Sequence, residues 1–321
     1  MNIRHGFTLV EILTVVVIIG ILVTLVTVAV KGAMDATQRT KIATQMSQLE
    51  MALDHYKAEF GEYPPDMFDD DALVRHVKKR WPRMDFSLKP GGISNAEYIK
   101  GAINAGYGKN VDFAAPGSEI GALGFWLGGF PDFEEKLSGF SADPENPFFS
   151  NPFVDVRGRV YDKKNFIDME VGEDKNMRLV DVGGGARAPV IGNDIRDVFM
   201  PVIYFRGKSS GGHEAYMISD SQHAKYKEIK QFDFSDTGLG VCVPYAEEKN
   251  GAVGEEVIKW KNPTTFQLLH PGLDGKFGEP APGGTTGAPL RIIKTGENIG
   301  QQNLDNLTNF SGYKELKSIL P

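Results

Sequence analysis

Three things are scarce in this chain of 321 residues: cysteine, excess positive charge, and proline near the start. Cys242 is the single cysteine, so the chain cannot form an internal disulfide. An exported domain that needs a stabilising cross-link would need one of another kind, for which a metal ion is the natural candidate. The net charge of −7 argues against a surface that coats nucleic acid, and we expect no nucleic-acid partner. No proline precedes Pro64, so nothing interrupts a helix that begins upstream.

Charge is also scarce between Phe7 and Val30, where 24 residues include a single ionisable side chain, Glu11. As an α-helix this run rises about 36 Å, which exceeds the roughly 30 Å hydrocarbon core of a bilayer, so it can span a membrane. A cleaved secretory signal is disfavoured because the run is too long and ends in Val-Lys-Gly. A plain anchor is disfavoured too, because a carboxylate in lipid costs at least about 2.5 kcal/mol unless it finds a partner. Glu11 is therefore a candidate functional residue.

The start of the chain resembles a known signal. A short leader ends in Gly6, Phe7 follows, and Glu11 stands four residues further on, which is similar to the class III signal of type IV pilins and type II secretion pseudopilins. The resemblance implies that a prepilin peptidase cuts between Gly6 and Phe7 and methylates the new amino group. The helix would then stay on the mature protein, with Glu11 neutralising the amino terminus of a neighbouring subunit.

The helical pattern continues beyond the apolar run. Apolar residues recur at helical spacing, at Ile42, Met46, Leu49, Leu53, Tyr56 and Phe60. This stripe predicts packing against the protein's own sheet, with a coiled-coil seam as the alternative. Gly61 and two prolines that follow it end the helix, so the sequence predicts one helix from Phe7 to Phe60. The helix end, through Pro64, resembles that of the major pseudopilin, so the resemblance covers about the first 65 residues.

The rest of the chain changes from helical to β-like texture. Short helices are predicted at Asp70–Arg80, at Asn95–Ala105 with Asn95 as its cap, and at Asp132–Ser138. The aromatic piece Leu123–Phe130 is interpreted as core or subunit contact. Strands are then predicted at Phe153–Tyr161, Met177–Val182, Val198–Arg206, Ala215–Ile218, Gly240–Pro244 and Thr264–Leu269.

Helix first and strands later indicate an α+β fold. In the pilin-like arrangement that the resemblance implies, an antiparallel sheet packs on the second half of the long helix, with a partly helical insertion. The expected organisation is a leader at 1–6, a membrane or filament-core helix at 7–30 and its amphipathic continuation at 31–64. A partly helical insertion at 65–150 and a β-rich part at 151–321 complete the chain.

No catalytic constellation is found in the sequence, and we predict that the protein is not an enzyme. The Gly207-Lys208-Ser209 piece lacks the glycine that a phosphate loop has five residues earlier, where Val202 stands. His213-Glu214 lacks the second histidine of a zinc-protease helix. Gly183-Gly184-Gly185 is interpreted as a turn rather than a nucleotide site.

One candidate metal site lies near the C-terminus. The turn around Asp274 resembles the Gly-x-Asp-Gly turn of major pseudopilins, in which a calcium ion ties a C-terminal loop together, although His270 replaces a small hydroxyl residue of that pattern. Calcium takes six to eight oxygen ligands, of which Asp274, Asp305 and Asn306 could supply the first. The alternative is that Asp274 stands in an ordinary turn and that Asp305 and Asn306 cap a short element.

The resemblance implies a structural subunit of a type IV filament or of a type II secretion pseudopilus. Its expected partners are copies of itself, other pilin-like subunits, the prepilin peptidase and an inner-membrane assembly platform. The expected location is the bacterial inner membrane, with a cytoplasmic amino terminus and a periplasmic domain, and then the filament. The alternative is a minor or tip pilin that binds secreted substrate, DNA or a surface, through aromatics such as Trp81, Phe125 and Trp126.

Overall fold

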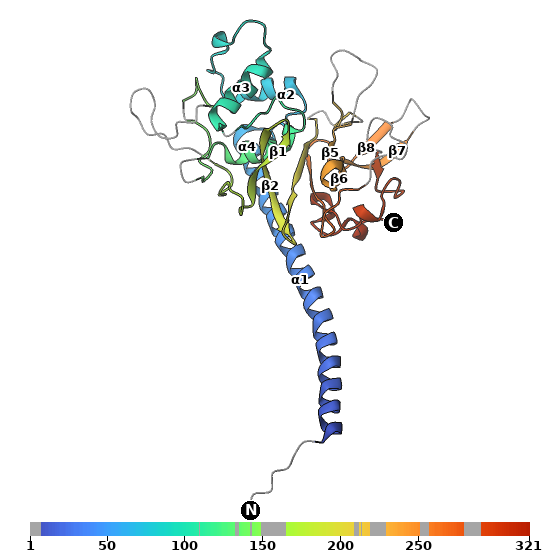
Figure 1. Ribbon diagram of the computed structural model, residues 1–321. Helices are drawn as coiled ribbons and strands as arrows, with labels where there is room; N and C mark the ends of the chain where they lie inside the picture. The colour runs from blue at the N-terminus through green and yellow to red at the C-terminus, as the bar shows by residue number, and fades with distance from the viewer. Residues whose placement is uncertain are drawn as a thin grey trace, which may run out of the picture.

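The protein consists of one very long helix and a mixed globular part that packs on the second half of that helix (Figure 1). The structure, a computed structural model, describes residues 8–108, 110–131, 135–141, 143–148, 165–208, 212, 214–218, 229–250, 257–278 and 290–321. The expected leader at 1–6 and the expected strand at Phe153–Tyr161 lie outside the described residues.

The long helix, α1, runs from Leu9 to Phe60 without a break, as predicted. Its 52 residues give it a length of about 78 Å. Gly61 ends it in the left-handed conformation, at φ 76°, and its N–H donates to the carbonyl of Lys57 over 2.7 Å. The predicted apolar stripe is confirmed, since its members from Ile42 to Tyr56 are fully buried and Phe60 is half-buried.

The described residues after α1 form three shorter α-helices: α2 (Asp70–Arg80), α3 (Asn95–Tyr107) and α4 (Ala122–Gly128). The prediction of α2 is confirmed. The cap of α3 is Ser94 and not Asn95, because the Ser94 hydroxyl accepts from the N–H of Glu97 while the Glu97 carboxylate accepts from the N–H of Ser94. Helix α4 carries most of the Leu123–Phe130 piece, and every residue of it is buried.

The predicted helix at Asp132–Ser138 is wrong for the residues that the structure describes. Leu137 forms an isolated antiparallel bridge with Pro131, and its N–H donates to the carbonyl of Met169 over 2.9 Å. Gly129 and Gly139, on either side of this segment, lie against each other with φ values of 71° and 78°, which favour glycine. A long-range pairing partner therefore replaces the local helical hydrogen bonds.

The strands of the described residues form small sheets rather than one. They are β1 (Met177–Gly183), β2 (Ala186–Ile195), β3 (Val198–Pro201), β4 (Ile203–Arg206), β5 (Phe232–Phe234), β6 (Gly240–Cys242), β7 (Tyr245–Asn250), β8 (Val257–Trp260), β9 (Phe266–His270), β10 (Arg291–Ile292) and β11 (Leu307–Thr308). Their orders are β1-β2-β3, β10-β7-β8, β11-β9-β4 and β5-β6. All pairings are antiparallel, as expected, except the parallel pair of β10 and β7.

The structure differs from the strand predictions in several ways, and β5, β7, β8, β10 and β11 lie outside every predicted range. The expected strand Val198–Arg206 is broken at Val202 and feeds two sheets, because β3 pairs with β2 and β4 pairs with β9. Ala215–Ile218 contributes only an isolated bridge from Met217. The longest strand of the described residues, β2, was not predicted at all, although the glycine turn before it was, and that turn closes the β1–β2 hairpin.

The β11-β9-β4 sheet separates two hydrophobic clusters, which explains its uniform burial. Tyr204 and Leu268 face the cluster built on α1, whereas Phe205 and Leu269 face the cluster shared with the later strands. Successive side chains of a strand point to opposite faces, so a sheet covered on both sides is buried along nearly its whole length, and its strands are mostly apolar. This sheet is the antiparallel layer that the stripe on α1 requires, and the α+β prediction is confirmed.

A buried polar network joins the end of α1 to α2. The Tyr56 hydroxyl lies 2.7 Å from His76 Nε2 and accepts from Arg80 Nη1 over 2.7 Å, while His76 Nδ1 lies 2.9 Å from Glu62 Oε1. Burial lowers the pKa of His76 to about 4 against the opposing effect of Glu62. The neutral ring therefore accepts from Tyr56 and donates to Glu62, and each ring nitrogen has a partner.

Candidate functional site

The first turn of α1 holds Glu11 in a capping box with Thr8. The N–H and the hydroxyl of Thr8 donate to Glu11 Oε2 over 2.7 and 2.9 Å, and the N–H of Glu11 donates to the Thr8 hydroxyl over 3.3 Å. A helix start has free N–H groups and a positive dipole end, so a carboxylate there is favourable. Glu11 thus has two roles open to it: capping its own helix and pairing with a charge from outside. Gly6 and Phe7, the expected processing site, lie outside the described residues.

The first half of α1 has no packing partner among the residues that the structure describes. Its large hydrophobic side chains from Leu9 to Met34 are between 50% and 83% exposed. The hydroxyls of Thr14, Thr24 and Thr27 donate to carbonyls four residues earlier, so these polar atoms are satisfied inside the helix. Within the described residues α1 is the helix that is long and apolar enough to cross a membrane, with a mean hydropathy of 3.0 over its most apolar window.

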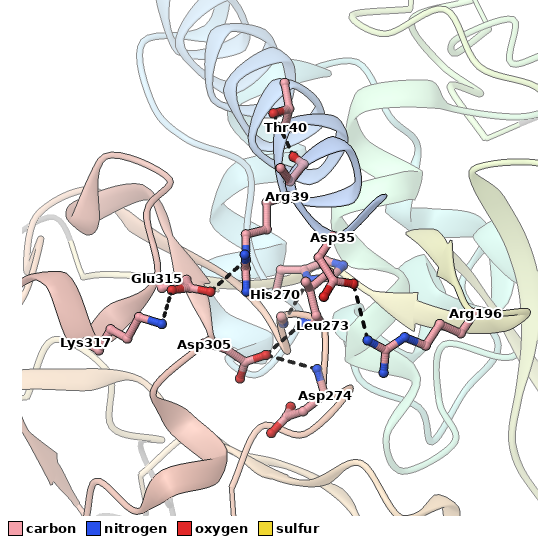
Figure 2. Close-up of polar contacts among 12 residues, drawn as sticks. Asp35, Arg39, Thr40, Arg196, His270, Leu273, Asp274, Asp305, Glu315 and Lys317 are labelled. Carbon is pink, nitrogen blue, oxygen red and sulfur yellow. Dashed lines mark hydrogen bonds and ion pairs between the residues drawn. The ribbon is translucent and has the colours of Figure 1, made fainter. Parts of the chain in front are cut away.

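Ion pairs bracket α1 where it leaves the globular part, a stretch from Asp35 to Arg39 that we call the neck (Figure 2). Arg39 Nε lies 2.7 Å from Glu315 Oε1, and Lys317 Nζ lies 2.5 Å from Glu315 Oε2. On the other side Arg196 Nη2 lies 3.4 Å from Asp35 Oδ1. Partly exposed pairs of this kind contribute at most about 1 kcal/mol each, so they orient the helix more than they stabilise the fold.

The predicted metal residues Asp274 and Asp305 lie together beside the neck (Figure 2). Asp305 Oδ2 accepts from the N–H groups of Leu273 and Asp274 over 2.8 and 3.0 Å, and Asp274 Oδ1 accepts from the N–H of Lys276 over 2.8 Å. The pKa of Asp274 is raised to about 6 because the turn partly desolvates its carboxyl group and the Asp305 carboxylate lies close. Asp305 Oδ1 is buried and finds no hydrogen-bond donor among the described residues.

Asn306, the third predicted ligand, is fully engaged with protein groups. In the amide orientation that satisfies all its neighbours, it donates to the carbonyls of Lys276 and Pro271 over 2.9 and 3.3 Å and accepts from the Tyr245 hydroxyl over 3.2 Å. His270 is buried below the turn, where its Nδ1 accepts from the N–H of Gly272 over 3.1 Å. The geometry therefore favours Asp274 and Asp305 over Asn306 as side-chain ligands.

The donor set of this turn fits a hard cation only in part. The carboxylates of Asp274 and Asp305 lie close together, and Asp305 raises the pKa of Asp274. Asp305 Oδ1 has no partner among the described residues. A calcium ion would balance both negative charges and would give this oxygen a ligand bond. Across the part of the chain that the structure describes, however, no group of three His, Cys, Asp or Glu side chains is placed to hold a metal. Main-chain carbonyls would have to supply the remaining oxygens.

The aromatic side chains considered for a binding surface lie in the core. Trp126 and Phe125 are fully buried and Trp81 is 8% exposed, within a cluster that also includes Phe140 and Phe148. Rings packed edge-to-face at such depth stabilise the fold and present nothing to a partner. The tip-binding alternative therefore loses the residues on which it depended.

Comparison with known proteins agrees with these features. The family model for the prokaryotic N-terminal methylation motif matches residues 1–27. The type II secretion system core protein G of Vibrio cholerae is 33% identical over 143 residues, which are 44% of this chain and 91% of that protein. The protein of the same name from Aeromonas hydrophila is 31% identical over 114 residues, covering 36% of this chain and 75% of that protein. No solved structure matches the chain.

Three features together define a pilin-like subunit. The chain begins with a methylation motif, the first half of its long helix is apolar and exposed, and a β-rich part packs on the second half of that helix. The chain belongs to the family of type II secretion system core protein G. The match with the Vibrio cholerae protein covers less than half of the present chain, so most of the globular part lies beyond it.

Sequence reasoning missed two parts of this region. The Thr8-x-x-Glu11 spacing is the signature of a capping box and could have been read from the sequence. The ion pairs of the neck join residues that are distant in the sequence: Asp35 and Arg196 are 161 positions apart. No local sequence pattern predicts such pairs.

Proposed function

We propose that this protein is a structural subunit of a type II secretion pseudopilus, assembled through α1. The carrying observation is the division of α1 into two halves. Its second half supplies the core stripe of the globular part, while its first half exposes an apolar surface that no other described part of the chain covers. Such a surface is stable in water only when it is covered, by lipid before assembly and by other subunits after it.

Processing and assembly follow from the start of the chain. A prepilin peptidase would cut between Gly6 and Phe7 and methylate Phe7, and the family match over residues 1–27 supports this. Glu11 would then pair with the amino terminus of a neighbouring subunit. Its capping contacts with Thr8 hold the carboxylate at the helix start, and Oε1 takes no part in them. One oxygen can thus serve the helix while the other meets the neighbour.

The location and partners are those of a subunit that begins in a membrane. We place the first half of α1 across the bacterial inner membrane, with the amino terminus in the cytoplasm and the globular part in the periplasm. The partners are further copies, other pilin-like subunits, the peptidase and the inner-membrane assembly platform. The names of the relatives, as core proteins of a secretion system, support a structural rather than an enzymatic role.

A calcium ion at the turn beside the neck is a further part of the proposal. Asp274 and Asp305 would hold it, together with main-chain carbonyls, while Asn306 would hold the turn itself through Pro271 and Lys276. Bound calcium would supply the positive charge that two neighbouring carboxylates need. It would also tie the C-terminal segment to the turn after β9, since Asp274 and Asp305 are 31 positions apart in the chain.

The assembly role of Glu11 is tested with Glu11→Ala, expressed alone and together with the wild-type protein. We expect membrane insertion to be retained and incorporation into filaments to be lost, as measured by alkaline extraction and by cross-linking of assembled subunits. Thr8→Ala is the matched control, because it removes the hydroxyl of the cap and keeps the carboxylate. Unchanged incorporation of Glu11→Ala, or an equal defect in Thr8→Ala, would refute the pairing role.

The calcium proposal is tested by thermal unfolding of the full chain in detergent, with calcium and with a chelator. A ligand present at about 100 times its dissociation constant stabilises the folded state by about 2.7 kcal/mol, so we expect a clear rise in the unfolding temperature. Asp274→Asn keeps the oxygen that accepts from Lys276 and should abolish the rise. Magnesium serves as the control ion. An unfolding temperature that is the same with calcium and with the chelator would overturn the proposal, and so would an equal rise with magnesium.

A further inference from the structure

The β2–β3 hairpin lies alongside α1 and points toward its apolar half (Figure 1). Gln45 Nε2 of α1 donates to the carbonyl of Gly192, and Arg196 at the end of the hairpin pairs with Asp35 over 3.4 Å. Ten helical residues span about 15 Å and four strand residues about 14 Å, so the two elements run in register and in opposite directions. The hairpin end is therefore held at the level of Asp35.

That level is close to the place where a membrane would end. The apolar run stops at Val30, five residues or about 8 Å along the helix from Asp35. A bilayer of about 40 to 45 Å with a hydrocarbon core of about 30 Å has a headgroup layer of roughly 5 to 8 Å on each side. With Val30 at the edge of the hydrocarbon, the hairpin end reaches the headgroup layer.

The residues at this end, Arg196, Asp197 and Val198, which we call the hairpin tip, have the chemistry of an interface. Val198 is 52% exposed, and among the described residues outside α1 only Val257 is another large hydrophobic side chain in that state. The Arg196 side chain is 65% exposed, and its pair with Asp35 is long, so the guanidinium has donors left for a phosphate. Lys31 lies one helical turn from Asp35 on the same face and adds a second cation.

The backbone of the hairpin tip gives independent support. Arg196 and Asp197 form the two-residue turn between β2 and β3 with φ values of 52° and 65°. Such a turn prefers Asn-Gly, and a residue with a side chain in the left-handed region costs about 1 kcal/mol or more. Strain of this kind persists only where the surrounding structure holds it, and it is frequent at functional sites. This turn lies at the end of the hairpin that points toward the apolar half of α1 (Figure 1).

We propose that the hairpin tip contacts phospholipid headgroups while α1 spans the membrane, with Arg196 on a phosphate and Val198 at the edge of the acyl region. The contact fixes the depth and tilt of α1 relative to the globular part before assembly. This inference rests on the membrane-inserted stage of the proposed function, and leaving the membrane for the filament would break the contact.

The test uses the full chain in phosphatidylcholine vesicles that contain headgroup-nitroxide lipid. A fluorophore is attached at Val198→Cys, with Val257→Cys as the matched control because Val257 is equally exposed and lies on β8; Cys242 is buried. We expect several-fold stronger quenching at residue 198 than at residue 257. A label at Gly20→Cys, a position with nothing within 4 Å, reports insertion of α1.

Three outcomes decide the matter. Deep burial of the residue 20 label with equal quenching at residues 198 and 257 would overturn the inference and leave membrane insertion intact. A residue 20 label that stays in water would overturn the membrane stage itself. Quenching at residue 198 that changes with the protein-to-lipid ratio would assign the hairpin tip to a second copy and also overturn the inference.

The role of Arg196 is tested with the double variant R196N/D197G in the Val198→Cys background. This turn should be at least as stable as the native one, because Asn-Gly relieves the strain. Adding phosphatidylglycerol to the vesicles should increase quenching at residue 198 in the parent and not in the double variant. An equal increase in both would show that Arg196 does not bind the headgroups.

Discussion

His76 makes the stability of the protein depend on pH in a defined window. Its ring is 1% exposed, and its two nitrogens meet the Tyr56 hydroxyl and the Glu62 carboxylate. A second ring proton would face a hydroxyl that already accepts from Arg80, so protonation breaks the chain of hydrogen bonds. The pKa of His76 is accordingly lowered from 6.5 to about 4.

A lowered histidine pKa means that the unfolded chain binds more protons than the folded chain between pH 6.5 and about 4. Stability is therefore complete above pH 6.5 and declines as the pH falls through this window. At pH 5 the difference between a pKa of 6.5 and one of about 4 is worth about 2 kcal/mol. The pKa of Glu62 is lowered to about 2, chiefly by its hydrogen bond with His76. The protein therefore loses the stability that Glu62 contributes only when the pH falls below 4.5, outside the range of this measurement.

The measurement is urea unfolding of the full chain in detergent at pH 7.5 and pH 5. Tryptophan fluorescence reports it directly, because the Trp126 ring lies 5.1 Å from the His76 ring. His76→Asn keeps a donor for Glu62 and does not titrate, so it should lose about 2 kcal/mol less than the wild type between these pH values. His55→Asn, at an exposed position on α1, should behave as the wild type. If His76→Asn keeps the full pH dependence, the assignment is wrong.

Two further perturbations have defined costs. Lys230 and Asp66 form an ion pair of 2.6 Å in which both side chains are 4% exposed. Asp66→Asn should therefore lower the free energy of unfolding in urea by about 3 to 5 kcal/mol. Changing both residues, with Asp66→Leu and Lys230→Met, should cost less than the single change. On α3, a Cβ at Gly106 would lie 2.3 Å from the carbonyl of Phe148, whereas one at Gly101 meets nothing. Gly106→Ala should thus destabilise by about 1 to 3 kcal/mol and Gly101→Ala should stabilise by up to about 1 kcal/mol, and equal effects would contradict the packing.

The long helix and α2 were predictable because their signals are local. Asp70–Arg80 and the end of α1 at Gly61 appear in the structure where the sequence places them, since caps, glycine and proline act through the nearest few residues. The wrong cap of α3 has the same cause, because Ser94 and Asn95 are both good caps and only the Glu97 partner separates them.

The strands were less predictable because their partners are distant. Val198–Arg206 reads as one apolar run, yet its halves pair with β2 and with β9. Pro201, directly before the break at Val202, is the local signal that the strand prediction passed over. Strand β2 was not predicted because Pro189 and Gly192 count against a strand. In the structure, the backbone of Met200 lies so close to Gly192 that only a glycine fits there. The orphaned oxygen of Asp305 likewise becomes visible only when the turn is folded.

The sequence by itself determined the long helix, its apolar half, the acid at position 11 and the family to which they point. These are properties of consecutive residues, which composition and spacing express directly. The tertiary structure alone decided that Asn306 is engaged by protein groups and that a hairpin returns along α1 to the edge of the apolar run. Contacts between residues far apart in the chain depend on packing, and packing is settled only by the whole fold.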